Sequence, residues 1–156
     1  MDYVEIVSDS VEDTKKIAEV IADNIRFGDT ILLNGEMASG KTAFSRFVFN
    51  RLGYSGVSSP TFTIINQYNN DDIKSYHMDL YRLSSEEDLI EAGFEECDDG
   101  QLVIIEWADM FYTEGDNCEI NIEIDIIDDN SRLFKIKARN ELCVILGGLK
   151  DEDTGD

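Results

Sequence analysis

At residues 35–42 the chain reads Gly35-Glu36-Met37-Ala38-Ser39-Gly40-Lys41-Thr42, which matches the phosphate-binding P-loop pattern G-x-x-x-x-G-K-[ST]. The run 30–33 before it is apolar and rich in strand formers, and the apolar residues of 44–52 after it keep helical spacing. A P-loop binds phosphate through loop N–H groups and the positive end of the following helix, so it needs a strand before it and a helix after it. This context predicts a nucleotide site in an α/β fold.

The loop supplies both backbone and side-chain ligands. We expect its N–H groups to wrap the phosphates, Lys41 to reach the β- and γ-phosphates, and the Thr42 hydroxyl to ligate Mg²⁺. GTP-binding proteins read guanine with an Asn-Lys-x-Asp segment, which this sequence lacks, so we expect ATP. The predicted nucleotide-binding residues of the loop are Gly35, Glu36, Met37, Ala38, Ser39, Gly40, Lys41, Thr42 and Ala43.

Two carboxylates follow predicted strands and are candidates for the rest of the chemistry. Phosphoryl transfer on a P-loop needs a carboxylate near the metal and a group that orients the attacking water. Asp79 ends the predicted strand that contains Tyr76 and His77, and Glu106 follows the apolar run 102–105. We expect both carboxylates at the carboxyl edge of the sheet, beside the loop, as metal-site residues.

Three further residues each have two interpretations. Thr61, in the segment Ser59-Pro60-Thr61-Phe62, is either a sensor of the γ-phosphate or part of a rigid turn. Trp107 either stacks on the nucleotide or fills the core, and the pattern favours the core. His77, the only histidine, is more typical of a structural residue than of a catalytic one.

The rest of the pattern predicts one domain over residues 1–150. Strict alternation predicts two antiparallel hairpins, at 62–81 and 120–136. Parallel-type buried runs combined with hairpins predict a P-loop NTPase-like three-layer fold, with a mixed parallel and antiparallel sheet flanked by helices. We also expect a last strand at 143–146 and a disordered acidic tail at 151–156.

Helix-start signals place two further helices. Ser10 is the expected N-cap of a first helix, which follows a strand at 3–7. Ser84 and Glu87 form a capping-box pattern that predicts a short helix ending near Gly93.

The composition limits partners and compartment. The 156 residues include 34 acidic and 13 basic side chains, for a formal charge of −21. This charge repels phosphate backbones, so we expect no DNA partner and no direct, independent binding of nucleic acid. Three cysteines without a C-x-x-C pair predict reduced thiols, and the sequence has no run of 18 apolar residues that would predict a membrane span. We therefore expect a cytoplasmic protein without a membrane partner.

Four motifs in a fixed order carry a family resemblance: the P-loop, Ser59-Pro60-Thr61-Phe62, His77-Met78-Asp79-Leu80-Tyr81-Arg82-Leu83 and Ile105-Glu106-Trp107. With them the chain resembles the TsaE family over nearly its whole length. The resemblance implies an ATPase of low intrinsic activity that supports tRNA threonylcarbamoyladenosine (t6A) modification by hydrolysing ATP in complex with TsaD and TsaB. It further implies catalytic roles for Glu106, Lys41 and Thr61, Mg²⁺ binding by Thr42, Asp79 and Glu106, and a position near the nucleotide for Trp107.

One loop position departs from the family, which usually has glycine where this chain has Ala38. An alanine forced to positive φ costs about 1 kcal/mol or more, which would weaken nucleotide binding. Two other functions stay open, a small-molecule P-loop kinase and a non-hydrolysing ATP-dependent binding module. The kinase would need an acceptor pocket, and the binding module would respond to ATP without needing Glu106.

Overall fold

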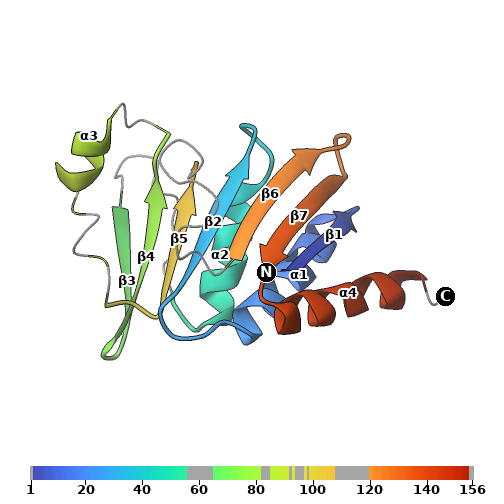
Figure 1. The fold of residues 1–156 in the computed structure, drawn as a ribbon, viewed down its shortest axis with the longest axis horizontal. Coiled ribbons are helices and arrows are strands. Elements are labelled where there is room, and N and C mark those ends of the chain that lie inside the picture. Colours follow the sequence, from blue (N-terminus) through green and yellow to red (C-terminus); the bar gives the residue numbers. More distant parts are fainter. Residues whose placement is uncertain are drawn as a thin grey trace.

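A seven-stranded sheet in the order β1-β7-β6-β2-β5-β4-β3 forms the centre of the computed structural model (Figure 1). The structure describes residues 2–55, 65–81, 85–91, 93, 97, 99–107 and 120–154. Its elements are β1 (Asp2–Ser8), α1 (Val11–Asp23), β2 (Asp29–Gly35), α2 (Lys41–Arg51), β3 (Ile65–Asn70), β4 (Ile73–Asp79), α3 (Glu86–Glu91), β5 (Leu102–Glu106), β6 (Ile120–Ile126), β7 (Arg132–Ala138) and α4 (Asn140–Thr154).

The sheet is mixed, as the sequence predicts. β2 lies between β5 and β6 and is parallel to both, and β5 is also parallel to β4. β3–β4 and β6–β7 are the two predicted antiparallel hairpins, and β1 adds to the edge of β7 in the antiparallel sense. The predicted α/β class with a mixed sheet is confirmed.

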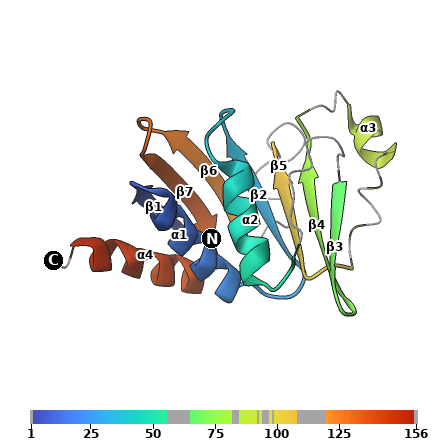
Figure 2. The same ribbon diagram turned by 180° about the vertical axis from the view of Figure 1, so that it is seen from behind.

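The larger hydrophobic core lies on the face of the sheet that α1, α2 and α4 cover, and Figure 2 shows α2 lying across that face. Ser10 caps α1 as predicted, because its Oγ accepts a hydrogen bond from the Asp13 N–H at 3.1 Å. Ile120, Ile122 and Ile124 of β6 point to this face and are fully buried, whereas Ile126 at the end of the strand is exposed. Burial of this apolar surface is the main force that holds the helices on the sheet. Its largest fully buried side chains include Ile17, Ile21, Ile31, Leu33, Phe44, Phe49 and Phe134.

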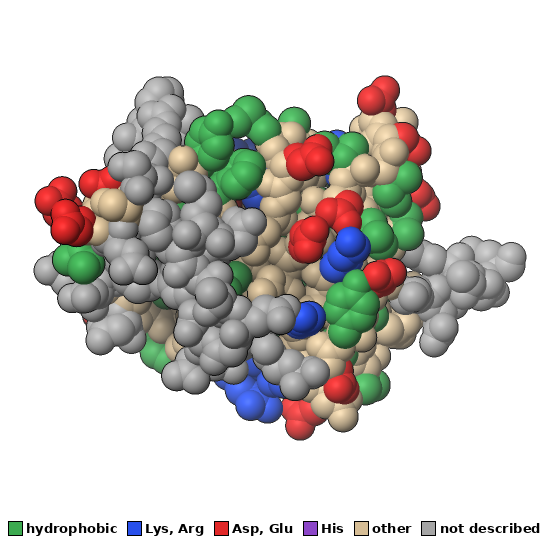
Figure 3. Space-filling view, turned by 45° about the horizontal axis from the view of Figure 1, so that its top comes forward, with side chains coloured by type: hydrophobic (Ala, Val, Ile, Leu, Met, Phe, Trp, Pro, Cys, Tyr) green, Lys and Arg blue, Asp and Glu red, His purple; other side chains and the backbone are tan. Residues whose placement is uncertain are grey.

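The opposite face is polar over β1, β7 and β6, where charged side chains lie at the surface (Figure 3). Lys135 stands opposite Glu5 on one side and Glu123 on the other, so charges of opposite sign face each other across the strands. A smaller apolar cluster covers the β5–β4 part of this face, and its buried members are Leu32, Tyr76, Met78, Leu80 and Ile105.

Two predicted elements differ in the structure. The expected strand at 143–146 is wrong, because this segment belongs to α4, which runs on to Thr154 and so includes part of the predicted disordered tail. Leu142 and Leu146 lie one helical turn apart and are both buried, while Val144 and Ile145 between them are exposed. None of the described helices is long and apolar enough to cross a membrane.

The start of α3 also differs from the prediction. The Oγ of Ser85 accepts from the Asp88 N–H at 3.2 Å, one position later than the expected pair. The predicted partner Ser84 lies outside the described residues.

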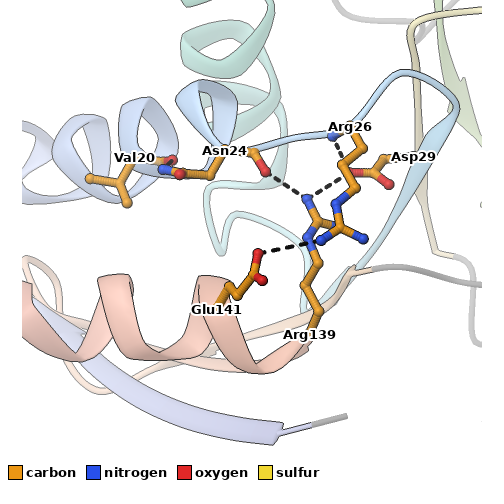
Figure 4. Close-up of polar contacts among 6 residues, drawn as sticks. All are labelled: Val20, Asn24, Arg26, Asp29, Arg139 and Glu141. Carbon is orange, nitrogen blue, oxygen red and sulfur yellow. Dashed lines mark hydrogen bonds and ion pairs between the residues drawn. The ribbon is translucent and has the colours of Figure 1, made fainter.

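An ion pair between the partly buried Arg139 and the buried Asp29 joins the α1–β2 turn to the start of α4 (Figure 4). Arg139 Nη2 donates to Asp29 Oδ2 at 3.1 Å and to the Asn24 carbonyl at 2.6 Å. The same Asp29 oxygen accepts from the Arg26 N–H at 2.7 Å, and the Asp29 side chain is 5% exposed. This network holds the first residue of β2 in place, and β2 leads from there to the P-loop.

Loss of the Arg139 guanidinium should destabilise the fold strongly. Arg139→Met leaves the buried Asp29 carboxylate without its cation, which should lower the free energy of unfolding by about 3–5 kcal/mol in urea titrations. The matched control is Arg26→Ala, which breaks only the exposed Arg26–Glu141 pair and should cost about 1 kcal/mol or less. Equal losses in the two variants would show that the buried pair does not tie α4 to the turn.

Candidate functional site

The P-loop connects β2 to α2 at the middle of the sheet. α2 begins at Lys41, its N-cap Gly40 has the left-handed φ of 105°, and no side chain in the described ranges caps this helix end by a hydrogen bond. The positive end of the helix is therefore left to an external anion, as in other phosphate sites. Lys41 is only 6% exposed, and its Nζ donates to the carbonyls of Gly35 at 2.7 Å and Glu36 at 2.9 Å. Its charge is thus enclosed by the loop.

Tight packing within the loop explains its first glycine. A Cβ at Gly35 would lie 2.7 Å from the Ile124 carbonyl oxygen and 2.7 Å from Ser39 Oγ, which no side chain tolerates. The loop thus turns directly against β6. A side chain at Gly35 would displace the loop.

Ala38 has φ 67°, so the position that departs from the family pattern lies in the left-handed region. The structure therefore supports the expected backbone strain, which costs a non-glycine residue about 1–2 kcal/mol.

Arg132, at the start of β7, holds the strained loop from outside. Its Nε donates to the Ser39 carbonyl at 3.1 Å and its Nη2 to the Ala38 carbonyl at 3.5 Å. The guanidinium is itself held by the Asp128 carbonyl at 2.6 Å. Sequence analysis missed this role, because Arg132 is 93 residues from Ser39 along the chain and carries no local signal.

Two hollows flank the loop in the described part of the chain. One, of about 180 Å³, lies beside the first turn of α2 and is lined by Ser10, Ser39, Gly40, Ala43 and Arg132 among others. The other, of about 750 Å³, opens on the polar face and is lined by Gly35, Glu36, Met37 and Trp107 together with charged side chains of β6 and β7. The loop is therefore accessible from both sides.

The two predicted carboxylates meet at the carboxyl edge of the sheet. Glu106 ends β5, where it pairs in register with Leu33 of β2 and with Asp79 of β4. Its side chain is 3% exposed, and its Oε1 lies 3.4 Å from Thr42 Oγ1 on the first turn of α2. The other oxygen, Oε2, contacts the Nε2 of His77, which is also buried. The parallel strand pairing thus brings the carboxylates to the loop.

Asp79 lies beside Glu106 in a half-buried position. Burial raises the pKa of Asp79 above its ordinary value, and the negative charge of Glu106 raises this pKa further. The Tyr81 N–H, which donates to Asp79 Oδ1 at 3.0 Å, and the charge of Lys41 oppose that shift. Because the two carboxylates at this edge carry the same charge and repel each other, binding of a cation between them would be favourable.

Trp107 connects the loop to the edge of β5. It has φ 60°, an unusual conformation for a bulky residue, and its N–H continues the ladder by donating to the Leu33 carbonyl at 3.0 Å. The indole ring lies 4.1 Å from Lys41 Nζ and 4.9 Å from the centre of the Tyr81 ring. The ring thus packs against the smaller apolar cluster and faces the P-loop lysine as well, so both interpretations of Trp107 retain support.

The donor atoms at this edge fit a small hard cation. Thr42, Asp79 and Glu106 offer oxygen only, the donor type that Mg²⁺ takes in nucleotide sites. No group of three His, Cys, Asp or Glu residues in the described ranges could hold a metal ion alone. The site thus suits an ion that keeps waters and phosphate oxygens as ligands, rather than an ion in an all-protein cage.

The structure brings together most of the predicted site residues, and one lies outside its description. Lys41, Thr42, Asp79, Glu106 and Trp107 all surround the mouth of the loop. The predicted catalytic residue Thr61, with its segment 59–62, lies outside the described residues.

Comparison with known proteins gives one family. Residues 8–134 match the model of a family described as threonylcarbamoyl adenosine biosynthesis protein TsaE. Curated proteins named tRNA threonylcarbamoyladenosine biosynthesis protein TsaE are similar to the chain. The one from Rickettsia felis is 35% identical over an alignment that covers 84% of this chain and 78% of the relative. The one from Bacillus subtilis is 38% identical over 81% of this chain and 80% of the relative. A crystal structure of Bacillus subtilis YdiB superposes with a TM-score of 0.69 at 27% identity, covering 97% of each chain.

Relief of the strain at Ala38 should stabilise the protein. Ala38→Gly suits the left-handed backbone and should raise the free energy of unfolding by up to about 1 kcal/mol, after the greater freedom of glycine in the unfolded chain is counted. The control Ala43→Gly changes an exposed residue of α2 and should lower the same quantity by about 1 kcal/mol. Urea unfolding measures both. A loss of stability in Ala38→Gly equal to that in Ala43→Gly would contradict the strain.

Proposed function

This chain belongs to the TsaE family of threonylcarbamoyladenosine biosynthesis proteins, and from that premise we propose that it is a P-loop ATPase of that pathway. In this proposal it binds ATP with Mg²⁺ and hydrolyses it while in complex with TsaD and TsaB. The observation that carries the proposal is the buried Glu106 carboxylate beside the P-loop, 3.4 Å from the Thr42 hydroxyl. A loop that only bound phosphate would not require a buried acid at this place.

Phosphate binding follows from the loop geometry. The uncapped start of α2 and the N–H groups of the loop attract the phosphates, and Lys41 already lies inside the loop. When ATP enters, the Lys41 ammonium exchanges its contacts with loop carbonyls for phosphate oxygens. This exchange needs little movement, because the carbonyls of Gly35 and Glu36 border the same space.

The carboxylates divide the remaining tasks. Thr42, Asp79 and Glu106 are the residues that would hold Mg²⁺, which supplies neutralisation of charge at the β- and γ-phosphates when bound. Glu106 also orients the water that attacks the γ-phosphate, because one of its oxygens is fixed by His77 and the other faces the Thr42 hydroxyl. The water oxygen bonds to the γ-phosphorus as the bond between that phosphorus and the bridging oxygen breaks. The protons of the water pass to the released phosphate and to solvent, and ADP and phosphate leave.

The charge of the chain supports a role within a complex. A formal charge of −21 does not favour direct binding of tRNA, so contact with tRNA passes through TsaD and TsaB in this proposal. Slow hydrolysis by the isolated protein fits a site that a partner completes.

The test is steady-state ATP hydrolysis by the purified protein, alone and with a TsaD–TsaB pair. We expect slow turnover that the pair stimulates, no turnover above background in Lys41→Ala, and a loss of at least about 100-fold in Glu106→Gln with ATP binding retained.

Two outcomes would favour the other functions. ATP-dependent binding to the pair that is unchanged in Glu106→Gln, without hydrolysis by the parent, would support a binding module. Release of ADP only when a small-molecule acceptor is added would support a kinase.

A further inference from the structure

His77 is a buried titratable residue whose side chain points from β4 to the carboxylate of Glu106. The side chains of His77 and Glu106 are 1% and 3% exposed, and His77 Nε2 contacts Glu106 Oε2. An ionised carboxylate can only accept hydrogen bonds, so Nε2 is the donor. The two residues are brought together because β4 and β5 pair in parallel, with His77 opposite Ile104 and two residues short of the strand end.

Within the described part of the chain, the rest of the His77 ring makes no polar contact that would explain its burial. Its Nδ1 is buried without a hydrogen-bond partner among the described residues, and its ring packs on Phe49 of α2 with centroids 5.5 Å apart. Burying a nitrogen without a hydrogen-bond partner costs free energy, and the packing of the ring on Phe49 offsets this cost. Among the residues that the structure describes, Glu106 is the one polar partner of the ring.

Ser75 provides a comparison on the same strand and the same face. It is also fully buried, but its Oγ donates to Tyr54 OH at 2.9 Å, and Tyr54 OH in turn donates to Gln101 at 2.8 Å. This chain of hydrogen bonds contains no residue of the P-loop site and joins only structural elements. His77, two residues closer to the sheet edge, directs its polar atom to the site instead.

We propose that His77 is a positioning residue that holds the Glu106 carboxylate by one oxygen, so that the other oxygen stays directed toward Thr42 and the attacking water. The inference rests on the proposed ATPase function and deepens it. Without the Nε2–H donor, Glu106 would be a buried carboxylate free to rotate away from the loop. Hydrolysis would then slow, while the loop would still bind ATP.

The experiment compares three substitutions at this residue. His77→Gln places an amide nitrogen close to the position of Nε2, His77→Asn places one close to Nδ1, and His77→Phe keeps a ring without a donor. We expect kcat to fall at least about tenfold in His77→Phe and His77→Asn, with KM for ATP within about threefold of the parent. His77→Gln should restore most of kcat. Ser75→Ala, the control for a buried polar residue, should keep the parent kcat even where its unfolding temperature is lower.

A double variant separates positioning from packing. If His77 acts through Glu106, adding His77→Phe to Glu106→Gln should leave the residual rate of Glu106→Gln unchanged. Three results would overturn the inference. They are a further tenfold loss of kcat in the double variant, a kcat in His77→Phe equal to that of the parent, and equal kcat values in His77→Gln and His77→Asn. The Gln–Asn comparison stands alone if the Phe variant does not fold. If the parent protein hydrolyses no ATP with or without TsaD and TsaB, the proposed function is overturned. If the parent is active and the His77 variants have the same kcat as the parent, only this inference is overturned.

Discussion

The parallel register of β2, β5 and β4 is the constraint on which the site depends. Parallel strands end at the same edge of a sheet, and here that edge carries the P-loop, Glu106 and Asp79 on three successive strands. A shift of one residue between β2 and β5 would turn Glu106 to the opposite face, away from Thr42. The apolar interiors of these strands fix this register because they must stay buried, so the same residues that stabilise the fold also align the polar groups.

Residues with strained backbone conformations lie at the same edge, and hydrogen bonds from neighbouring strands hold them in place. Ala38 and Trp107 both have positive φ, and Gly40 supplies the left-handed turn from which α2 begins. Conformations of this kind persist only where surrounding contacts hold them, and they are common at binding sites. Arg132 provides such contacts from β7, and the backbone ladder from Trp107 to Leu33 provides them from β2. The region that would bind phosphate is thus fixed before any ligand arrives.

Much of this arrangement could be predicted from the sequence, and what could not be depends on tertiary contacts. The P-loop, the two hairpins and the positions of Asp79 and Glu106 carry local signals of spacing and periodicity, and the fold class follows from them. The strand expected at 143–146 is wrong, because a short apolar run does not by itself distinguish a strand from a helix, and burial of Leu142 and Leu146 selects a helix. The contact of His77 with Glu106 spans 29 residues, and that of Arg132 with Ser39 spans 93, so neither leaves a pattern in the sequence. As the only histidine, His77 is predicted to be structural, and only the pairing of β4 with β5 brings it to Glu106.

The most direct test of the account is intrinsic fluorescence, because Trp107 is the only tryptophan and its ring lies 4.1 Å from Lys41 Nζ. If ATP draws Lys41 toward its phosphates, the surroundings of the indole change on binding. Titration of the parent protein with ATP and Mg²⁺ should therefore give a saturable change in emission. AMP, which lacks the β- and γ-phosphates that Lys41 would reach, should give none at the same concentrations. Emission that stays constant up to millimolar ATP, or that responds equally to AMP, would contradict the claim that this edge of the sheet is an ATP site.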